Sequence, residues 1–329
     1  MELKEKEVLV TGAGGFIGSH LTEKLVAEGA NVHAFVRYNS KGKAGFIDSF
    51  PNKTRSKIDL IFGDVLELET VRKALAKIDC VFHLAASISV AYSFKNPEEV
   101  IAVNSKGTLN VLTAAKDNNV KRIITASSSE VYGTAITVPI SEGHPLQGQS
   151  PYAASKIAGD KYAESFYKSY RIPITVVRPF NTYGPRQSAR AIIPTIIMQA
   201  LAKDKIKLGS LTPRRDFTYV TDTADGFIKI AKSDKVYGEV INLSNMDDVS
   251  IGELANKIIK LTGKKAKIES SDERIRPENA EVQRLLGDNS KAKKLVGWSP
   301  KVSLDEGLKS TIKWISEHID EYKPDEYSV

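Results

Sequence analysis

Short aliphatic runs alternate with helix-patterned segments through the first half of this 329-residue chain, and this alternation limits the possible fold more than any other feature. Parallel strands that are buried on both faces read as nearly continuous Val, Ile and Leu, as VLV, LIF and VFHLAA do. Strands followed by helices predict a parallel sheet with helices on both faces. We predict strands at residues 8–11, 32–36, 60–62, 80–84, 122–126 and 175–178, and helices near 16–28, 67–77, 98–118 and 151–170.

The second half of the chain has a looser pattern. Strands near 217–220 and 239–243 are expected to return to the sheet, with smaller elements around them. Because a domain usually holds about 150 residues, the length favours two units. The predicted fold is α/β, a Rossmann-type doubly wound parallel sheet with a smaller, mixed α/β C-terminal substrate domain. Residues 1–178 are expected to bind a dinucleotide, with the return near 217–243, while residues 179–216 and 244–329 form the second unit.

The first predicted strand runs directly into TGAGGFIGSHL, which spaces Gly12, Gly15 and Gly18 as G-x-x-G-x-x-G. Glycines let the backbone turn sharply and approach a pyrophosphate, which the N-terminus of the following helix then binds. The segments GDV and HLAA end two further strands and are expected to border the same crevice. A dinucleotide is therefore expected to contact the three glycines and Phe16, Ile17, Asp64, Val65, Leu84, Ala85 and Ala86.

The end of the second strand bears on the choice of dinucleotide. A carboxylate at this point would bind the adenosine ribose diol, whereas an arginine can pair with a 2′-phosphate. The sequence here is VHAFVRYN, which has no acidic residue and places Arg37 at the tip. Either NADP or NAD fits the loop, and Arg37 favours NADP. A solvated loop arginine is the alternative interpretation.

A candidate catalytic set follows the fifth strand, in SSSEVYG and PYAASK. Tyr152 and Lys156 are four residues apart and hence share one face of a helix. A tyrosine has an ordinary pKa of about 10 and is a poor base at neutral pH. A nearby ammonium and an oxidised nicotinamide both favour the phenolate, so the pair makes a usable base. Ser128 would supply a hydroxyl to the same substrate oxygen.

Taken together, the glycine loop, the Ser plus Tyr-x-x-x-Lys set, RPFNTYGPRQ and RDFTYVTD resemble the extended short-chain dehydrogenase/reductase family of nucleotide-sugar enzymes. The resemblance extends from about residue 7 to about residue 315. It implies a nucleotide-sugar substrate, further cofactor contacts at Asn104 and Pro179, and a homodimer. Substrate diphosphates favour arginine forks, and the resemblance assigns substrate binding to Asn181, Arg186, Arg215 and Arg276.

The segments around Glu130 distinguish between reactions of the family. Glu130 fills the position that resembles the glutamate of dehydratases. Ser129 stands where glucose-type dehydratases carry an aspartate that acts as an acid. The proton donor to the leaving hydroxyl therefore stays unassigned. EVYGTA, HPLQGQSPY and RPFNTYGPRQSARAIIPT most resemble 4,6-dehydratases of UDP-N-acetylglucosamine in legionaminic-type sugar pathways. We therefore expect a 4,6-dehydratase with Ser128, Ser129, Glu130, Tyr152 and Lys156 as its catalytic residues.

Two other functions stay open at this stage. A nucleotide-sugar 4-epimerase, of the UDP-glucose or UDP-N-acetylglucosamine type, needs only the serine, tyrosine and lysine, and Glu130 argues against it. A non-catalytic dinucleotide-sensing protein would be expected to lack Tyr152 or Lys156, and both are present.

Charge and composition narrow the partners and the location. The net charge of +7 comes from 47 basic and 40 acidic residues that alternate along the chain, so nucleic acid is not an expected partner. One cysteine and five scattered histidines predict no metal site and a reducing compartment. No apolar run reaches the roughly 18 residues of a membrane span, and no signal peptide is apparent, so we expect a cytoplasmic protein without a membrane partner.

A dimer could form where two predicted helices, 98–118 and 151–170, pair across a two-fold axis as a four-helix bundle. Apolar residues along both helices motivate this expectation. Part of each apolar helix face must pack on the sheet, so the sequence is almost equally consistent with a monomer. These residues are Val103, Leu109, Val111, Leu112, Ala158, Tyr162 and Phe166.

Overall fold

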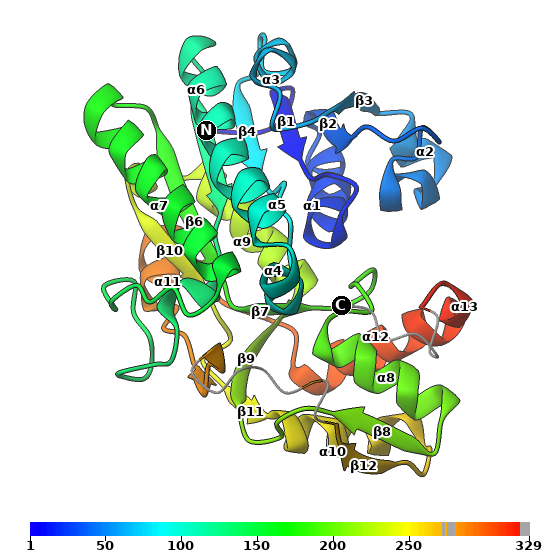
Figure 1. Ribbon diagram of the computed structural model, residues 1–329. Helices are drawn as coiled ribbons and strands as arrows, with labels where there is room; N and C mark the ends of the chain where they lie inside the picture. Colours follow the sequence, from blue (N-terminus) through cyan, green and yellow to red (C-terminus); the bar gives the residue numbers. More distant parts are fainter. Residues whose placement is uncertain (272–273, 275–279, 323–329) are drawn as a thin grey trace.

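A computed structural model describes residues 1–271, 274 and 280–322 of the chain. Its centre is a seven-stranded sheet with the strand order β10-β6-β5-β4-β1-β2-β3, in which every neighbouring pair is parallel (Figure 1). The predicted α/β Rossmann-type sheet is thus confirmed. Its strands are β1 (Glu7–Thr11), β2 (Asn31–Arg37), β3 (Ile58–Gly63), β4 (Cys80–His83), β5 (Arg122–Ala126), β6 (Ile174–Pro179) and β10 (Val240–Leu243).

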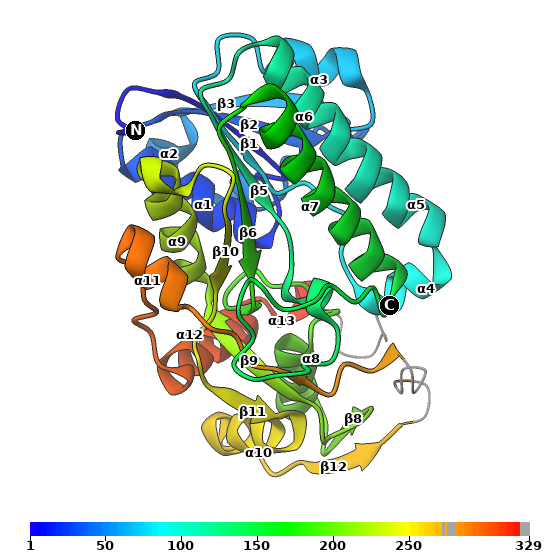
Figure 2. The ribbon, with the colours of Figure 1, turned by 90° about the vertical axis from the view of Figure 1, so that its left-hand side faces the viewer.

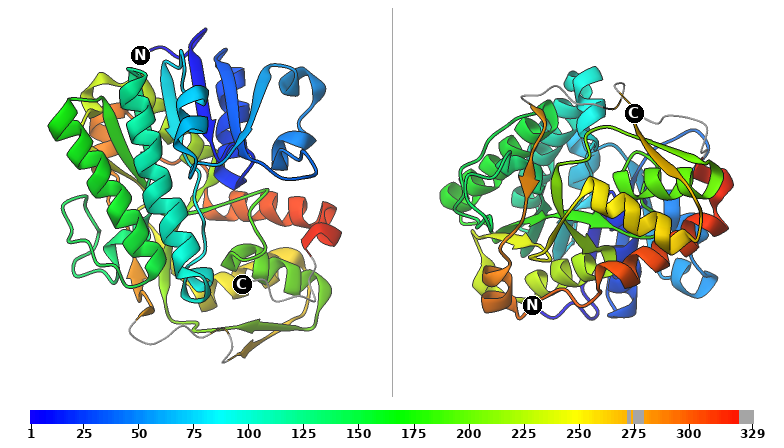
Figure 3. Two further views of the ribbon diagram at one scale, coloured as in Figure 1. Left: turned by 45° about the horizontal axis from the view of Figure 1, so that its top comes forward. Right: turned by 90° about the horizontal axis from the view of Figure 1, so that it is seen from below.

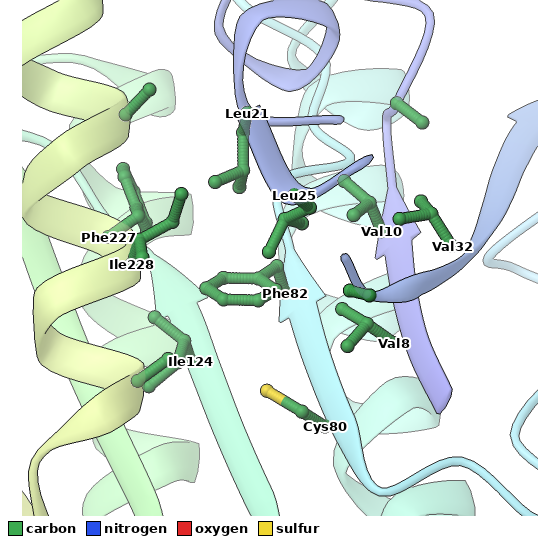
Figure 4. Close-up of a cluster of buried hydrophobic side chains, with 14 of the residues drawn as sticks. Val8, Val10, Leu21, Leu25, Val32, Cys80, Phe82, Ile124, Phe227 and Ile228 are labelled. Atoms are coloured by element: carbon green, nitrogen blue, oxygen red, sulfur yellow. The ribbon is translucent and has the colours of Figure 1, made fainter. Parts of the chain in front are cut away.

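Helices cover both faces of this sheet (Figure 2). Because side chains alternate along a strand, Val8 and Val10 face one helical layer and Leu9 faces the other. Figure 4 shows the first core, in which Phe82 of β4 lies between Leu25 and Phe227. The first layer contains α1 (Phe16–Ala27), α9 (Val220–Lys232) and α11 (Ser290–Val296), and the second contains α3 (Leu68–Ala74), α6 (Gly107–Asp117) and α7 (Pro151–Tyr170).

The helix expected at 98–118 is divided into three segments. These are α5 (Pro97–Ile101), a π-helical segment η2 (Ala102–Lys106) and α6. Single π-helical turns inside helices often occur at functional sites, and η2 carries Asn104 toward the ends of the strands. The remaining short helices near the sheet are η1 (Gly45–Ser49), α2 (Asn52–Arg55), α4 (Val90–Lys95), η3 (Ser129–Tyr132) and η4 (Asp234–Val236).

A second, smaller unit lies beyond the carboxyl ends of the strands. In it β9 (Arg214–Tyr219) pairs with β7 (Asn181–Tyr183), β11 (Asp248–Ser250) and β13 (Arg284–Leu285), while β8 (Lys205–Leu208) pairs with β12 (Lys267–Ser270). Figure 3 shows α12, in red, between the first unit and α8. The helices of this unit are α8 (Ile192–Ala202), α10 (Ile251–Thr262), α12 (Leu304–Glu317) and α13 (Ile319–Tyr322).

The expected return of residues 217–220 to the large sheet is wrong. β9 joins the smaller sheet, and only β10 returns to the large one, beside β6. A short apolar strand does not encode its pairing partner, which depends on where the chain places β7 and β11. The chain re-enters the first unit one element later, as α9, which packs against α1 and the sheet.

Candidate active site

The glycine loop between β1 and α1 is tightly packed against the loop that follows β4. Gly12 has a φ of +69°, and a Cβ at this position would lie 2.8 Å from the Ala85 nitrogen. A Cβ at Gly18 would lie 2.1 Å from the Gly12 oxygen. α1 begins at Phe16, and its N-cap residue, Gly15, has no side chain. The loop therefore leaves backbone N–H groups at a helix N-terminus close to an open cavity, as a pyrophosphate requires.

A cavity of about 440 Å³ lies beside this loop. Its walls come from the carboxyl ends of β1, β2, β3 and β4, the place where open parallel sheets bind nucleotides. The glycines whose Cβ positions are blocked and the size of the cavity fit a nicotinamide dinucleotide. Of the predicted cofactor residues, six line it: Gly12, Arg37, Asp64, Val65, Ala85 and Ala86.

Hydrogen bonds from buried side chains fix the loop after β4. The Thr11 hydroxyl accepts from the backbone N–H groups of Leu84 and Ala85, each at 3.1 Å. His83 contacts Thr11 at 2.8 Å and Thr108 at 3.0 Å, and burial lowers the pKa of His83 to about 3, so the ring is neutral. Thr11 is not among the predicted site residues, although a hydroxyl at the last position of β1 was a usable signal.

Asn104 supports the site without lining the cavity. Its side chain accepts from Ser87 N–H at 2.8 Å and donates to the Ser87 oxygen at 3.0 Å and the Ser155 hydroxyl at 2.9 Å. These bonds tie η2 to both the loop after β4 and α7. The buried amide is therefore a support of the cofactor loop, and Pro179, another predicted contact, is the last residue of β6.

The predicted catalytic hydroxyls meet at the end of β5. Ser150 caps α7 by accepting from the Ala153 N–H at 3.1 Å, and this starts the helix one residue before Tyr152. The Ser128 and Tyr152 side chains form a hydrogen bond. Burial raises the pKa of Tyr152 to about 12, and the bond with Ser128 opposes that rise.

Lys156 follows Tyr152 by one helical turn and is almost fully buried. Its ammonium donates a 2.8 Å hydrogen bond to the Ala126 oxygen, which joins α7 to the end of β5. Burial lowers the pKa of Lys156 to about 8, against the opposing effect of Asp160.

Glu130 also belongs to this cluster. It lies in η3, where the Ser128 hydroxyl accepts from the Glu130 N–H at 3.2 Å. The half-buried Glu130 carboxylate is close enough to Tyr152 to raise the pKa of the phenol, a smaller effect than burial. Ser129, the other predicted residue of the segment, is buried. The site thus holds a pair of hydroxyls, an ammonium and one carboxylate.

A buried polar network lies next to Lys156 on α7. Arg178 of β6 donates to the Asp160 carboxylate at 2.9 Å and to the Tyr132 hydroxyl at 2.9 Å. Tyr132 in turn donates to Asn242 of β10 at 2.7 Å. Asp160 is not among the predicted site residues. Its spacing of four residues from Lys156 places both on one helix face and was the available signal.

The predicted substrate residues are only partly brought together. Asn181 begins β7 and pairs with Phe217 of β9, the strand that also carries Arg215. The Arg215 guanidinium is buried and donates to Glu281 at 3.1 Å. Arg276 lies outside the residues that the structure describes.

Arg186 lies between α1 and α12, and its role as a substrate ligand stays a prediction. Its guanidinium pairs with Glu23 of α1 at 3.0 Å and lies 5.1 Å from the Phe50 ring centroid and 5.9 Å from that of Trp314. It therefore joins the two units between α1 and α12. The sequence GPRQ does not show in which direction the Arg186 side chain points. The left-handed backbone at this residue, with a φ of +68°, decides that direction.

Within residues 1–271, 274 and 280–322, no group of three or more His, Cys, Asp or Glu side chains is placed to hold a metal ion. No helix in the same ranges combines the length and the apolar character needed to cross a membrane.

Comparisons with known proteins place this geometry among nucleotide-sugar enzymes. The family model described as GDP-mannose 4,6 dehydratase matches residues 9–311. The human dTDP-D-glucose 4,6-dehydratase is 32% identical over 326 residues, which cover 97% of this chain and 92% of that protein. The UDP-N-acetyl-alpha-D-glucosaminuronate decarboxylase of Bacillus cytotoxicus is 35% identical, over 95% of this chain and 98% of that protein.

A solved structure of another nucleotide-sugar enzyme is also similar to this chain. A variant of UDP-glucuronic acid 4-epimerase from Bacillus cereus, in complex with UDP-4-deoxy-4-fluoro-glucuronic acid and NAD, superposes with a TM-score of 0.87. It is 31% identical and covers 95% of this chain and 99% of that chain. Dehydratases, decarboxylases and epimerases are therefore all similar to this chain.

Proposed function

Because this chain belongs to the extended short-chain dehydrogenase/reductase family of nucleotide-sugar dehydratases and epimerases, we propose that it is a nucleotide-sugar 4,6-dehydratase acting on UDP-N-acetylglucosamine. The observation that carries this proposal is the carboxylate of Glu130 beside the Ser128–Tyr152 hydroxyl pair. An epimerase needs one acid–base group at C4, whereas elimination of water needs a second base for C5. The UDP-N-acetyl sugar is favoured by the segments around Tyr152 and Asn181 that resemble such dehydratases.

The roles of the side chains follow from their positions. Tyr152 takes the proton of the 4-hydroxyl, and Ser128 holds the same oxygen through its hydroxyl. When bound, a nicotinamide dinucleotide supplies the hydride acceptor for C4 and the hydride donor for C6. The 4-ketone acidifies C5–H, because the resulting carbanion is an enolate. Glu130 removes that proton, and the 6-hydroxyl takes up a proton and leaves as water. A proton then returns to C5 as the hydride returns to C6, so the sugar loses one water and undergoes no net oxidation.

Lys156 is the group that makes Tyr152 usable as a base. Its ammonium is one helical turn away, and a cation at that distance favours the phenolate. Deprotonated Tyr152 would otherwise be disfavoured by burial, which raises its pKa to about 12.

For the cofactor we propose NADP, held by the amides of the glycine loop, by Asp64 and Val65, and by Arg37 at the 2′-phosphate. β2 ends at Arg37, and no acidic residue lies there to accept the ribose diol. For the substrate diphosphate we propose Asn181, Arg215 and Arg276, the first two carried by paired strands that lead from the catalytic residues into the second unit.

Mass spectrometry after incubation with UDP-N-acetylglucosamine tests the reaction directly. A product lighter by one water supports the dehydratase. An unchanged mass with altered sugar stereochemistry identifies a 4-epimerase, and an unaltered sugar nucleotide supports a dinucleotide-sensing protein.

Two variants separate the proposed roles of the bases. Glu130→Gln keeps the size of the side chain but removes its basicity, so the nicotinamide should become reduced while product formation falls about 10²–10⁴-fold. Tyr152→Phe should fail to reduce the nicotinamide. Glu164→Gln, which changes a partly exposed carboxylate on α7, is the matched control and should react normally. Normal turnover by Glu130→Gln would contradict the proposed elimination step.

A further inference from the structure

Arg190 reaches the dinucleotide cavity from the second unit. It lies in the loop between β7 and α8, and its side chain lines the same cavity as Arg37 of β2. Its guanidinium carbon is 5.3 Å from the centroid of the Tyr92 ring. The cavity therefore has an arginine from each unit of the protein at its wall.

Both arginines act on one group. The hydrogen bond that Tyr92 donates to Glu99, at 2.6 Å, raises the pKa of the Tyr92 phenol, and Arg190 and Arg37 both oppose that rise. The charges of Arg190 and Arg37 consequently converge on the wall that Tyr92 forms. Asp64 and Val65, two of the predicted dinucleotide contacts, line the same cavity.

The two guanidinium groups are free to bind a ligand. Among the residues that the structure describes, neither Arg37 nor Arg190 forms an ion pair, whereas Arg178, Arg186 and Arg215 each bind a carboxylate. Both side chains are exposed at the cavity. A pair of solvated arginines at one cavity attracts an anion that can bind them simultaneously.

Each acidic residue of the cavity accepts a hydrogen bond from a neighbour other than the two arginines. Asp64 accepts from the Leu66 N–H at 2.9 Å, and Glu99 accepts from the Tyr92 hydroxyl. Both donors are uncharged, so the two carboxylates keep their charge. Within the described ranges of the chain, neither carboxylate forms an ion pair with Arg37 or Arg190, and both guanidinium groups stay available to an anionic ligand.

We propose that Arg190 is a second ligand of the adenosine 2′-phosphate, so that the phosphate is held between Arg37 of the first unit and Arg190 of the second. This inference rests on the proposed use of NADP. A phosphate held in this way would tie the loop before α8 to the dinucleotide, and this loop follows directly on the strand that carries the proposed substrate ligand Asn181.

Calorimetric titration of the cofactor-free enzyme with NADP and with NAD measures the contribution of each arginine without relying on turnover. Loss of one charge-assisted contact should weaken NADP binding by Arg190→Ala about 10- to 100-fold and change NAD binding less than about threefold. Arg190→Lys keeps the charge and should recover part of the affinity. Arg171→Ala removes an exposed arginine at the end of α7 and should bind both dinucleotides normally.

The pattern across the variants distinguishes the two proposals. If Arg37→Ala leaves the NADP-to-NAD preference unchanged, the use of NADP is wrong and the role of Arg190 falls with it. If Arg37→Ala lowers the preference but Arg190→Ala does not, NADP use stands and the second ligand is refuted. Equal weakening of NADP and NAD by Arg190→Ala would also overturn the inference, because it would show a contact common to both dinucleotides.

Discussion

The Asp160 carboxylate and the Arg178 guanidinium form a buried ion pair, 2.8 Å long, one helical turn beyond Lys156. The pair joins α7 to β6, and Arg178 extends the connection to the Tyr132 hydroxyl. A buried ion pair adds little to folding stability compared with apolar side chains of the same volume. Removal of one partner, however, leaves the other charge buried without a counter-charge. The helix that carries Tyr152 and Lys156 is therefore held to the sheet by a contact that is costly to break.

We expect Asp160→Asn to lower the free energy of unfolding by about 3–5 kcal/mol, because it leaves Arg178 buried without a counter-charge. Urea unfolding measures the loss. Glu164→Gln breaks an exposed ion pair on the same helix and should cost only about 0.2–1 kcal/mol. Equal losses in the two variants would contradict the structural role of the buried pair.

Lys156 should make the stability of the protein depend on pH. Burial lowers its pKa from 10.5 to about 8, so between these values the folded protein binds fewer protons than the unfolded chain. Stability due to this group therefore rises with pH across that window, by about 1.4 kcal/mol for each unit and by up to about 3 kcal/mol in total.

The variant Lys156→Met removes the buried charge and isolates this effect. It should be more stable than the unmodified protein below pH 8, where burial of the ammonium costs most. The difference in unfolding free energy should shrink toward higher pH. A difference that stays constant across the window would show that the Lys156 ammonium is not destabilised by burial.

Replacement by alanine should have opposite effects at two glycines, Gly18 next to the dinucleotide loop and Gly159 on α7. Gly18→Ala places a Cβ 2.1 Å from the Gly12 oxygen, so the loop must move and dinucleotide binding should be lost. Gly159→Ala, in the middle of α7, places a Cβ 3.6 Å from the nearest atom of Thr108 and should stabilise the helix by up to about 1 kcal/mol. Thermal unfolding and a dinucleotide titration compare the two. Unimpaired binding by Gly18→Ala would refute the role of this loop.

The structure narrows the proposed dimer surface. Val111 and Leu112 are buried inside the protomer, so they are unavailable to a partner. Ile101 and Leu109 are 47% and 36% exposed on α5 and α6, and they remain available. We expect sedimentation to show a dimer at micromolar concentration and a monomer after Ile101→Asp with Leu109→Asp. A monomeric unmodified protein would exclude this assembly.

The sequence by itself determined the features that depend on short-range patterns. Aliphatic runs predicted six strands of the large sheet, because a strand buried on both faces must be apolar along its length. The loop at Gly12 and the helix face shared by Tyr152 and Lys156 were equally readable, since each follows from local backbone geometry.

Only the tertiary structure decided which distant segments meet. It assigned β9 to the smaller sheet, turned Arg186 toward Glu23, and brought Arg190 to the same cavity as Arg37. Local periodicity carries no information about these contacts, because each joins segments far apart in the chain. Arg186, for example, pairs with Glu23 of α1 and lies beside Trp314 of α12, so the packing of the two units determines which groups this side chain can reach.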